Sequence, residues 1–309
     1  MPGSLVVVNP RASKVRDAPT MAALTEHLGR VLQARDGAEP ELIETAAETD
    51  VAPAVERAVE TGMAAVIAVG GDGTLRQAAA SLAGTDVPLG IVPAGTGNQV
   101  AAVMGVPGSL AKAIDALESA TPRVIDLGEV TIGRADGSTE VSTFLLGCGA
   151  GFDAELMATT STALKRRIGT AAYFVQGAGL ALRLSARPCR IIIDDRAVET
   201  GVTSALIGNM GQLVPGRLGL RLPLDPADGS LDLIVVSADN VAGGLAGLIE
   251  QLRRTELGGN GGDRSLRLRG TAISIEPLEP MPLEVDGDPV GDGSLHARIR
   301  PGALRVLAP

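Results

Sequence analysis

Glycines and one aspartate that directly follow an apolar run are the strongest candidates for chemistry. Residues 66–75 read Val-Ile-Ala-Val-Gly-Gly-Asp-Gly-Thr-Leu. Glycines let a backbone approach a phosphate closely, and the N–H groups at the start of a helix, expected here at Thr74, would face the anion. Asp72 could hold Mg²⁺ through water or orient the transferred group. The alternative is a tight strand-to-helix turn in which Asp72 is only a cap.

A second glycine loop follows the next apolar run, with the sequence Pro-Ala-Gly-Thr-Gly-Asn at residues 93–98. Because both loops follow strands, they are expected to line one crevice at the carboxyl edge of a sheet. Thr96 and Asn98 offer side-chain hydrogen bonds, and residues 9–13 open onto the same edge. Neither loop is a Walker A motif, since no Gly-Lys-Ser/Thr follows, and neither has the spacing of the dinucleotide fingerprint.

Two acidic turns lie far downstream. The segment Asp286-Gly287-Asp288 is by itself a plain hairpin turn. The segment from Asp225 to Asp232 is either a solvated loop or a site for a hard cation, which prefers carboxylate and carbonyl oxygens. The spacing of its residues does not decide between a solvated loop and a cation site.

The elements that must position these residues change in character along the chain. Up to about Asp126, apolar runs alternate with helical patterns, which predicts a parallel, doubly wound α/β sheet. The expected strands there are Leu5–Val8, Glu41–Thr45, Ala65–Val69 and Pro88–Val92, and the expected helices are Thr20–Arg35 and a segment from the N-cap Asp50 to about Gly62.

Beyond Asp126, turn-separated strand patterns predict a mainly antiparallel β-sandwich with a helical insert over Ala154–Ser185. The expected strands are Val124–Ile132, Val141–Leu146, Arg190–Ile193, Thr203–Gly208, Leu231–Val236, Ser265–Leu268, Ala272–Ile275, Leu283–Val285 and Ala297–Ile299.

Composition limits the function classes. Hydrophobic residues make up 45% of the 309 residues and aromatics 1%, so the core must be aliphatic. The net charge of −9 argues against nucleic acid as a partner. Cys148 and Cys189 lack metal-ligand spacing and fit two reduced, buried thiols. The N-terminus shows no signal-peptide pattern and no apolar stretch is long enough to span a bilayer, so a soluble cytoplasmic protein is expected.

Taken together, these motifs resemble the diacylglycerol kinase catalytic family, which includes bacterial lipid kinases and the sphingosine and ceramide kinases. The segments that carry the resemblance span nearly the whole chain: Asn9-Pro10, Gly70–Thr74, Gly95–Asn98, Gly149–Asp153, Asp228-Gly229 and Asp286-Gly287.

The resemblance implies a Rossmann-like N-terminal domain, similar to phosphofructokinase and NAD kinase, and a β-sandwich C-terminal domain with inserted helices. Residues 1–126 would bind the nucleotide, residues 127–300 would bind the lipid substrate, and residues 301–309 would pack back on the first domain. The active site would lie between the two domains.

Site residues follow from the same resemblance. Asp286 would be the general base and Asp72 would serve the phosphates and the catalytic Mg²⁺, with the carboxylate of Asp228 and the carbonyls of Asp225 and Ser230 holding a structural Mg²⁺. The residues expected to contact ATP are Asn9, Pro10, Arg11, Ala12, Ser13, Thr45, Gly70, Gly71, Asp72, Gly73, Thr74, Leu75, Arg76, Thr96 and Asn98.

Two positions depart from the family pattern. Asp288 stands where the family often has Glu, and Gln99 stands where Asp is common, which leaves site geometry and substrate choice open.

The acceptor is expected to be a lipid hydroxyl, with diacylglycerol first and a sphingoid base or ceramide next. An NAD kinase shares the first glycine loop and a β-rich second domain, but the Asn-Glu pair and the Thr-Gly-Ser segment expected of it are absent from the sequence. A catalytically silent nucleotide- or lipid-binding regulator is a further possibility, against which the presence of both Asp72 and Asp286 argues.

Partners are expected to be a lipid substrate and, transiently, the membrane surface. Apolar residues between Leu156 and Leu184, next to Lys165, Arg166 and Arg167, fit either a lipid gate with a basic collar or an ordinary amphipathic helix. A homodimer is compatible with the resemblance, because family members often dimerise.

Overall fold

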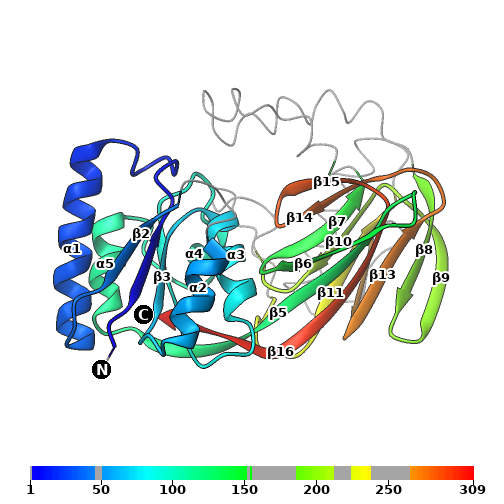
Figure 1. Ribbon diagram of the computed structural model, residues 1–309. Helices are drawn as coiled ribbons and strands as arrows, with labels where there is room; N and C mark the ends of the chain where they lie inside the picture. The colour runs from blue at the N-terminus through cyan, green and yellow to red at the C-terminus, as the bar shows by residue number, and fades with distance from the viewer. Residues whose placement is uncertain (1, 46–50, 152–153, 155–185, 212–223, 238–264) are drawn as a thin grey trace. The chain divides into compact units, whose positions relative to one another are not determined.

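The computed structural model describes residues 2–45, 51–151, 154, 186–211, 224–237 and 265–309 (Figure 1). The chain forms two compact units. Unit 1 comprises Met1–Leu127 with Pro301–Pro309, and unit 2 comprises Gly128–Arg300. The segment predicted as a helical insert, with Lys165, Arg166 and Arg167, lies outside the described residues except for Ala154. No helix in the described ranges is long and apolar enough to cross a membrane.

Unit 1 is a parallel α/β sheet in the strand order β2-β1-β3-β4, with Val306 at the end of β16 beside Leu89 of β4. Helices α1 and α5 lie on one side of the sheet and α2 and α3 on the other (Figure 1). The elements are β1 (Leu5–Val8), α1 (Ala18–Asp36), β2 (Glu41–Glu44), α2 (Val51–Glu60), β3 (Val66–Gly70), α3 (Asp72–Leu82), β4 (Leu89–Pro93), α4 (Gln99–Val103), α5 (Leu110–Leu117), the start of β5 (Thr121–Gly133) and the end of β16 (Ser294–Ala308).

The two faces of this sheet explain why β1 and β3 are unbroken apolar runs. Val6 and Val8 belong to one aliphatic core with Leu28 of α1 and Ile114 of α5. The alternate residues, such as Val7, are also fully buried. A parallel sheet covered by helices on both faces requires this pattern. The helices that pack on both faces therefore fix the positions of the carboxyl ends of the strands.

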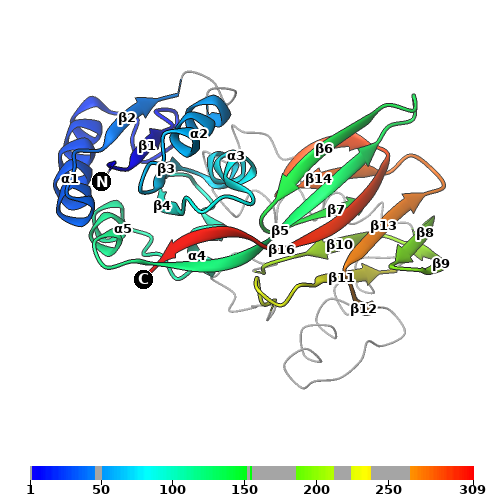
Figure 2. The same ribbon diagram turned by 60° about the horizontal axis from the view of Figure 1, so that its bottom comes forward.

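Unit 2 is an antiparallel β-sandwich. One sheet has the order β12-β11-β10-β7-β14-β15, and the other joins β9, β8, β13 and β16, with β5 paired to β16 and to β6 (Figure 2). The remaining elements are β6 (Thr139–Phe144), β7 (Gly147–Gly151), β8 (Arg187–Ile193), β9 (Arg196–Val202), β10 (Ser204–Gly208), β11 (Leu231–Val236), β12 (Ser265–Gly270), β13 (Ala272–Pro277), β14 (Pro282–Val285) and β15 (Asp288–Asp292).

The core of unit 2 is aliphatic, as the composition predicts. Ile132 of β5 and Ile273 of β13 share one buried cluster with Ile207 of β10 and Leu233 of β11, so residues from both sheets meet in it. Together with the parallel sheet of unit 1, this sandwich confirms the predicted fold class.

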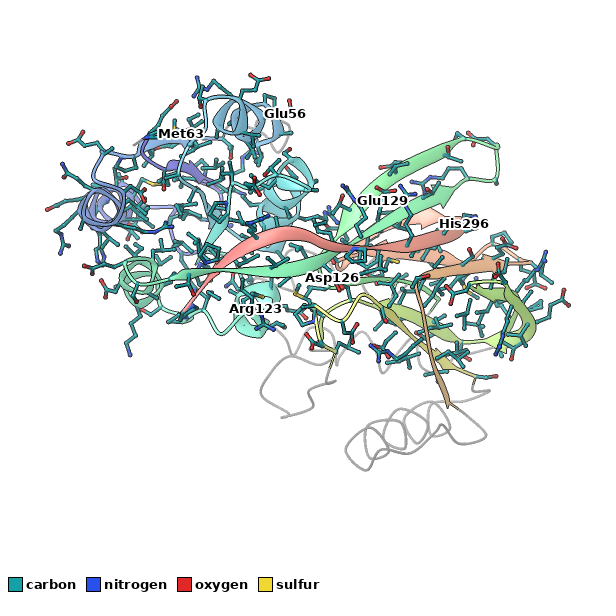
Figure 3. All side chains as sticks on the ribbon, turned by 90° about the horizontal axis from the view of Figure 1, so that it is seen from below. Glu56, Met63, Arg123, Asp126, Glu129 and His296 are labelled. Atoms are coloured by element: carbon teal, nitrogen blue, oxygen red, sulfur yellow. The ribbon has the colours of Figure 1, made fainter. Side chains whose placement is uncertain are left out.

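Strands β5 and β16 run side by side and each contributes residues to both units (Figure 3). In unit 1, Asp126 accepts a hydrogen bond from the N–H of Gly302 at 2.8 Å. In unit 2, Glu129 pairs with Arg298 at 2.5 Å. Asp126 is buried, so this bond satisfies a carboxylate that is out of reach of bulk water.

Several element boundaries differ from those predicted. Helix α3 begins at Asp72 and not at Thr74, because the extended Gly71 serves as its N-cap. The prediction missed β7, whose sequence Gly-Cys-Gly-Ala-Gly has almost no strand propensity, together with the exposed edge strands β9 and β15. Strand β7 forms because pairing with β10 and β14 on either side outweighs its weak propensity.

Candidate active site

The first glycine loop joins β3 to α3. Gly71 is extended, with φ −97°, and its carbonyl accepts the first helical hydrogen bond, from the N–H of Leu75 at 3.2 Å. The N–H groups of residues 72–74 lie in the first turn of α3, where a helix has no carbonyl to offer them. This end of α3 can therefore donate hydrogen bonds to an anion.

Close packing explains some of the glycines in the two loops. A Cβ on Gly70 would lie 2.5 Å from Thr74 Oγ1, and a Cβ on Gly95 would lie 2.5 Å from Gly71 Cα. Gly73 is different, because a Cβ there would meet no described atom within 4 Å. Gly70 and Gly95 are thus needed by the fold itself, whereas no described atom fills the space beside Gly73.

The second glycine loop is held together by Asn98. Its Oδ1 accepts from the N–H of Gly95 at 2.9 Å, and its Nδ2 donates to the Gly95 carbonyl at 2.6 Å. The N–H groups of Ala94 and Gly95 also donate to the carbonyl of Gly70, at 2.8 and 3.1 Å, which ties this loop to the first. Asn98 is therefore a loop-forming residue, while the exposed Thr96 is the polar side chain that the loop presents.

The carboxylate of Asp72 connects the two loops. Its Oδ2 accepts from the N–H of Gln99 and its Oδ1 accepts from the N–H of Val100, each at 3.1 Å. Asp72 therefore caps the N-terminus of α4, although it belongs to α3. With both oxygens bound to backbone N–H groups, Asp72 fits a Mg²⁺ ion through bridging water better than it fits direct coordination.

The loop after β1 packs against both glycine loops. Asn9 Nδ2 lies 3.3 Å from Thr74 Oγ1, and Ser13 Oγ donates to the Ala94 carbonyl at 3.2 Å. Lys14, which sequence reasoning missed, donates from Nζ to the carbonyls of Pro93 at 3.0 Å and Gly108 at 2.7 Å. Partial burial lowers the pKa of Lys14. The nearest sequence signal was its place directly after the polar segment 9–13.

Three residues predicted to contact ATP have buried side chains. Ala12 is 7% exposed and lies in the core of unit 1. Leu75 is 1% exposed. Thr45 is also buried and directs both its N–H and its Oγ1 to the carbonyl of Val8, at 2.9 and 3.3 Å. The side chains of these three residues pack within unit 1, and the predicted contact with ATP would fall to their main-chain atoms.

Asp286 occupies the turn between β14 and β15. Asp286 and Gly287 both have positive φ, 50° and 83°, as a two-residue hairpin requires. The carboxylate accepts three backbone hydrogen bonds: Oδ2 from Leu145 at 2.9 Å, and Oδ1 from Leu146 at 2.8 Å and Gly147 at 3.0 Å. The segment is thus the plain hairpin that its sequence indicated, and it also holds one carboxylate in a fixed orientation.

Glu284 is a second acidic residue of this turn, and sequence reasoning missed it. It is 5% exposed and its Oε2 accepts from the N–H of Gly287 at 2.6 Å. It lies opposite Gly149 of β7, where a Cβ would come within 3.0 Å of Glu284 Oε1. The sequence signal that could have identified Glu284 is its position between two apolar residues, Leu283 and Val285, of a predicted strand. A glycine-rich β7 makes room for it.

The carboxylates of the acidic turn before β11, where a structural Mg²⁺ is predicted, have partners within the protein. Asp225 Oδ1 accepts from the N–H of Ala227 at 3.1 Å. Asp228 Oδ1 accepts from the N–H of Ser230 at 3.0 Å, and its Oδ2 pairs with the guanidinium of Arg269. Among the described residues, no group of three or more His, Cys, Asp or Glu side chains is arranged to hold a metal ion.

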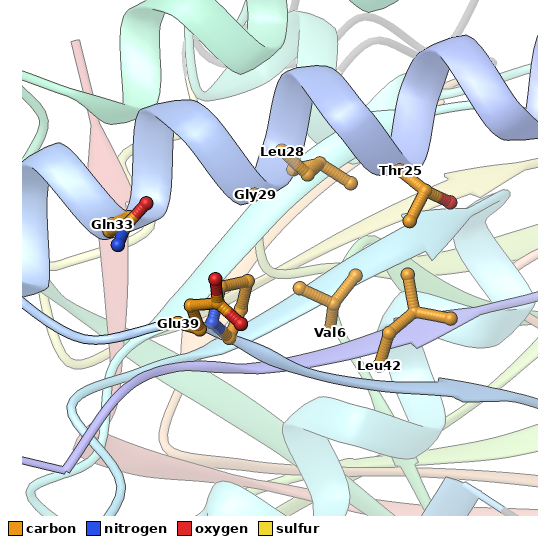
Figure 4. Close-up of a pocket in the computed structure, with 8 residues that line it drawn as sticks. Val6, Thr25, Leu28, Gly29, Gln33, Glu39 and Leu42 are labelled. Atoms are coloured by element: carbon orange, nitrogen blue, oxygen red, sulfur yellow. The ribbon is translucent and has the colours of Figure 1, made fainter.

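A cavity of about 210 Å³ lies in unit 1 between α1 and the first two strands (Figure 4). Its walls are Val6, Thr25, Leu28, Gly29, Gln33, Glu39, Pro40 and Leu42. None of these is a predicted site residue, so this cavity is separate from the two glycine loops.

Comparison with known proteins identifies the family. The diacylglycerol kinase catalytic domain family matches residues 4–130, and the YegS C-terminal NAD kinase beta sandwich-like domain family matches residues 147–308. A protein of Pseudomonas aeruginosa named "Probable lipid kinase YegS-like" is 34% identical over 82% of this chain and 80% of its own length. The chain belongs to the YegS-like lipid kinase family. This confirms the resemblance and makes the chain a kinase of the transferase class.

Solved structures confirm the fold of this YegS-like kinase. A putative diacylglycerol kinase from Bacillus anthracis strain Sterne superimposes with a TM-score of 0.77 at 20% identity, over 99% of this chain and 95% of its own. Yeast NADH kinase complexed with NADH gives a TM-score of 0.53 at 14% identity, over 100% of this chain and 84% of its own. At these identities the likeness concerns the fold alone.

Proposed function

We propose that this YegS-like kinase transfers the γ-phosphoryl group of ATP to the hydroxyl of a lipid. Diacylglycerol is the first acceptor to test, with phosphatidic acid as its product. The observation that carries the proposal is the Asp286 carboxylate, which the N–H groups of Leu145, Leu146 and Gly147 fix in one orientation on a hairpin turn. A proton acceptor needs such a fixed position to act on one particular hydroxyl.

The proposed transfer forms one bond to phosphorus and breaks another. The lipid hydroxyl oxygen forms a bond to the γ-phosphorus, and the bond from that phosphorus to the β,γ-bridging oxygen breaks. The hydroxyl proton passes to the Asp286 carboxylate, and ADP leaves with the electron pair of the broken bond. Such a transition state needs alignment and charge neutralisation more than covalent help.

Unit 1 would bind the nucleotide. The N–H groups in the first turn of α3 would donate to phosphate oxygens, and the space beside Gly73 would admit them. When bound, Mg²⁺ would offset phosphate charge, with Asp72 holding it through water. Thr96, exposed on the second loop, would add a side-chain hydrogen bond. The proposal thus gives each unit one part of the reaction, with Asp72 in unit 1 and Asp286 in unit 2.

A lipid panel tests the proposal directly. The purified chain is incubated with labelled ATP, Mg²⁺ and vesicles that contain diacylglycerol, a sphingoid base or ceramide, with NAD⁺ in a separate reaction. We expect label in one lipid product, identified by mass spectrometry. Label in NADP⁺ alone would favour NAD kinase. ATP binding without any labelled product would favour a silent binder.

Asp286→Asn is the variant that tests Asp286 as the proposed general base. An amide at this position keeps the volume but turns one acceptor oxygen into a donor, which faces a backbone N–H. We expect kcat to fall by roughly 10²–10⁴-fold, the typical contribution of a general base. A thermal melt separates this loss from unfolding. Normal turnover by a folded Asp286→Asn protein would refute the assignment.

A further inference from the structure

Arg269 lies where the acidic turn before β11 would bind a cation. The antiparallel register of β11 and β12 places Arg269 directly opposite Asp232. From there its guanidinium pairs with Asp228 Oδ2, and its Nε lies 3.7 Å from Asp232 Oδ1. One side chain from a neighbouring strand therefore links the turn carboxylate to a strand carboxylate.

The two carboxylates are enclosed to different degrees. The side chain of Asp232 is 4% exposed and that of Asp228 is 27% exposed, against 50% for Arg269. A carboxylate as buried as Asp232 is costly unless a positive charge or hydrogen bonds accompany it. A planar guanidinium can satisfy two carboxylates at once, because its N–H groups point in fixed, separate directions.

A divalent cation and a guanidinium would compete for this carboxylate. Mg²⁺ would need an Asp228 oxygen within about 2.1 Å, yet Oδ1 accepts from the N–H of Ser230 and Oδ2 contacts Arg269. A second positive charge at this spot would also repel the guanidinium.

We propose that Arg269 takes the place of a structural divalent cation at the turn Asp225–Ser230. The sandwich of unit 2 is then held by an internal ion pair and does not need Mg²⁺ to be stable. A further consequence is that any Mg²⁺ requirement of turnover reports only the ion that acts with the nucleotide. The inference goes beyond the proposed function and does not depend on which acceptor the kinase uses.

Thermal melts of the full chain without nucleotide test this inference. The wild-type chain, Arg269→Met and Arg269→Lys are each melted in EDTA and in millimolar MgCl₂. We expect the wild-type Tm to be the same in both buffers. Arg269→Met should melt lower by roughly 4 °C or more in EDTA, and Mg²⁺ should restore part of that loss by binding the exposed carboxylates. Arg269→Lys keeps the charge but lacks the planar fork that reaches both carboxylates, so its Tm should lie between those of the wild type and Arg269→Met.

Two further variants make the outcome decisive. Arg298→Met, which removes the pair with Glu129 on another part of unit 2, is the control for loss of an arginine and should leave the Tm nearly unchanged. Asp228→Asn locates any effect of Mg²⁺. A wild-type Tm that rises with Mg²⁺, and no longer rises in Asp228→Asn, would overturn the proposal. An unchanged Tm for Arg269→Met would also overturn it. If Arg269→Met fails to fold, the wild-type and Asp228→Asn melts still decide.

Discussion

Gly95 and Gly71 touch backbone to backbone, so that a Cβ on Gly95 would lie 2.5 Å from Gly71 Cα. Gly71 caps α3 and Gly95 belongs to the turn that Asn98 closes. The contact therefore sets the spacing of the two loops that are proposed to bind ATP. A pair of glycines is the closest approach that two main chains can make.

Gly95→Ala should push the two loops apart. We expect a loss of about 1–3 kcal/mol in the free energy of unfolding, as for other overpacked sites, together with weaker ATP binding. Urea unfolding and nucleotide titration measure the two effects. Gly108→Ala is the control, because a Cβ there meets no described atom within 4 Å. Equal behaviour of the two variants would contradict the packing argument.

Gly73→Ala should separate stability from nucleotide binding. Gly73 is in the first turn of α3 and has open space around its would-be Cβ, so alanine should leave stability unchanged or raise it by up to ~1 kcal/mol. If phosphate occupies that space, the KM for ATP should rise roughly tenfold or more, about 1.4 kcal/mol. A stable Gly73→Ala protein with unaltered KM for ATP would show that phosphate does not bind there.

Asp72→Asn tests whether Asp72 is more than a cap for α4. Asparagine keeps one acceptor oxygen, so one of the two N–H groups, of Gln99 or Val100, loses its partner. The stability loss should be about 0.5–2 kcal/mol. Loss of the negative charge should lower kcat by roughly 10²-fold or more while ATP still binds. A kcat within a few-fold of wild type would leave Asp72 with the capping role alone.

Gly29→Ala should stabilise unit 1. Gly29 lies within α1 at the edge of the cavity in Figure 4, and a Cβ there meets no described atom within 4 Å. Alanine should add about 0.5–1 kcal/mol through helix propensity. Gly37→Ala is the opposite control, because Gly37 ends α1 with φ 73° and an alanine there is strained. Urea unfolding should place the two variants on either side of wild type.

The two thiols should make stability fall at alkaline pH. Burial raises the pKa of Cys189 to about 11 and that of Cys148 well above its ordinary value, with Glu284 adding to the latter. The stabilisation is fully present below pH 9.0, the ordinary value, and is lost as pH rises through 11, because the unfolded chain releases these protons first.

Urea unfolding between these pH values measures the effect. A variant with both cysteines replaced by alanine should lose less free energy of unfolding over this pH range, because it lacks the two thiols. Other titrating groups would account for the loss that remains. Native wild-type chain should also resist thiol labelling at pH 8, and rapid labelling there would contradict the burial of both thiols.

Much of unit 1 is predictable because each signal is local. An unbroken apolar run such as Val66–Val69 followed by glycines fixes a buried strand and its loop, and both were placed correctly to within a residue or two. What could not be predicted depends on partners distant in sequence. Lys14 reaches Gly108, and Arg269 reaches Asp228. No period or spacing encodes those contacts.

The same limit explains the residues missed in unit 2. Strand β7 is recognisable only once β10 and β14 lie beside it, since its glycines carry no pattern of their own. As long as that strand is not predicted, the space that accommodates Glu284 cannot be predicted either. The role of Asp286 as a fixed carboxylate also depends on N–H groups about 140 residues earlier in the chain.

Main-chain groups, and not side chains, fix the orientation of Asp286. A substitution at Leu145 or Leu146 changes the side chain but leaves the N–H donor in place. The side chains around the carboxylate can therefore be redesigned, or can diverge during evolution, without changing the orientation of the carboxylate. Under the proposed function, this hairpin would be a suitable fixed point for engineering kinases that accept new alcohols.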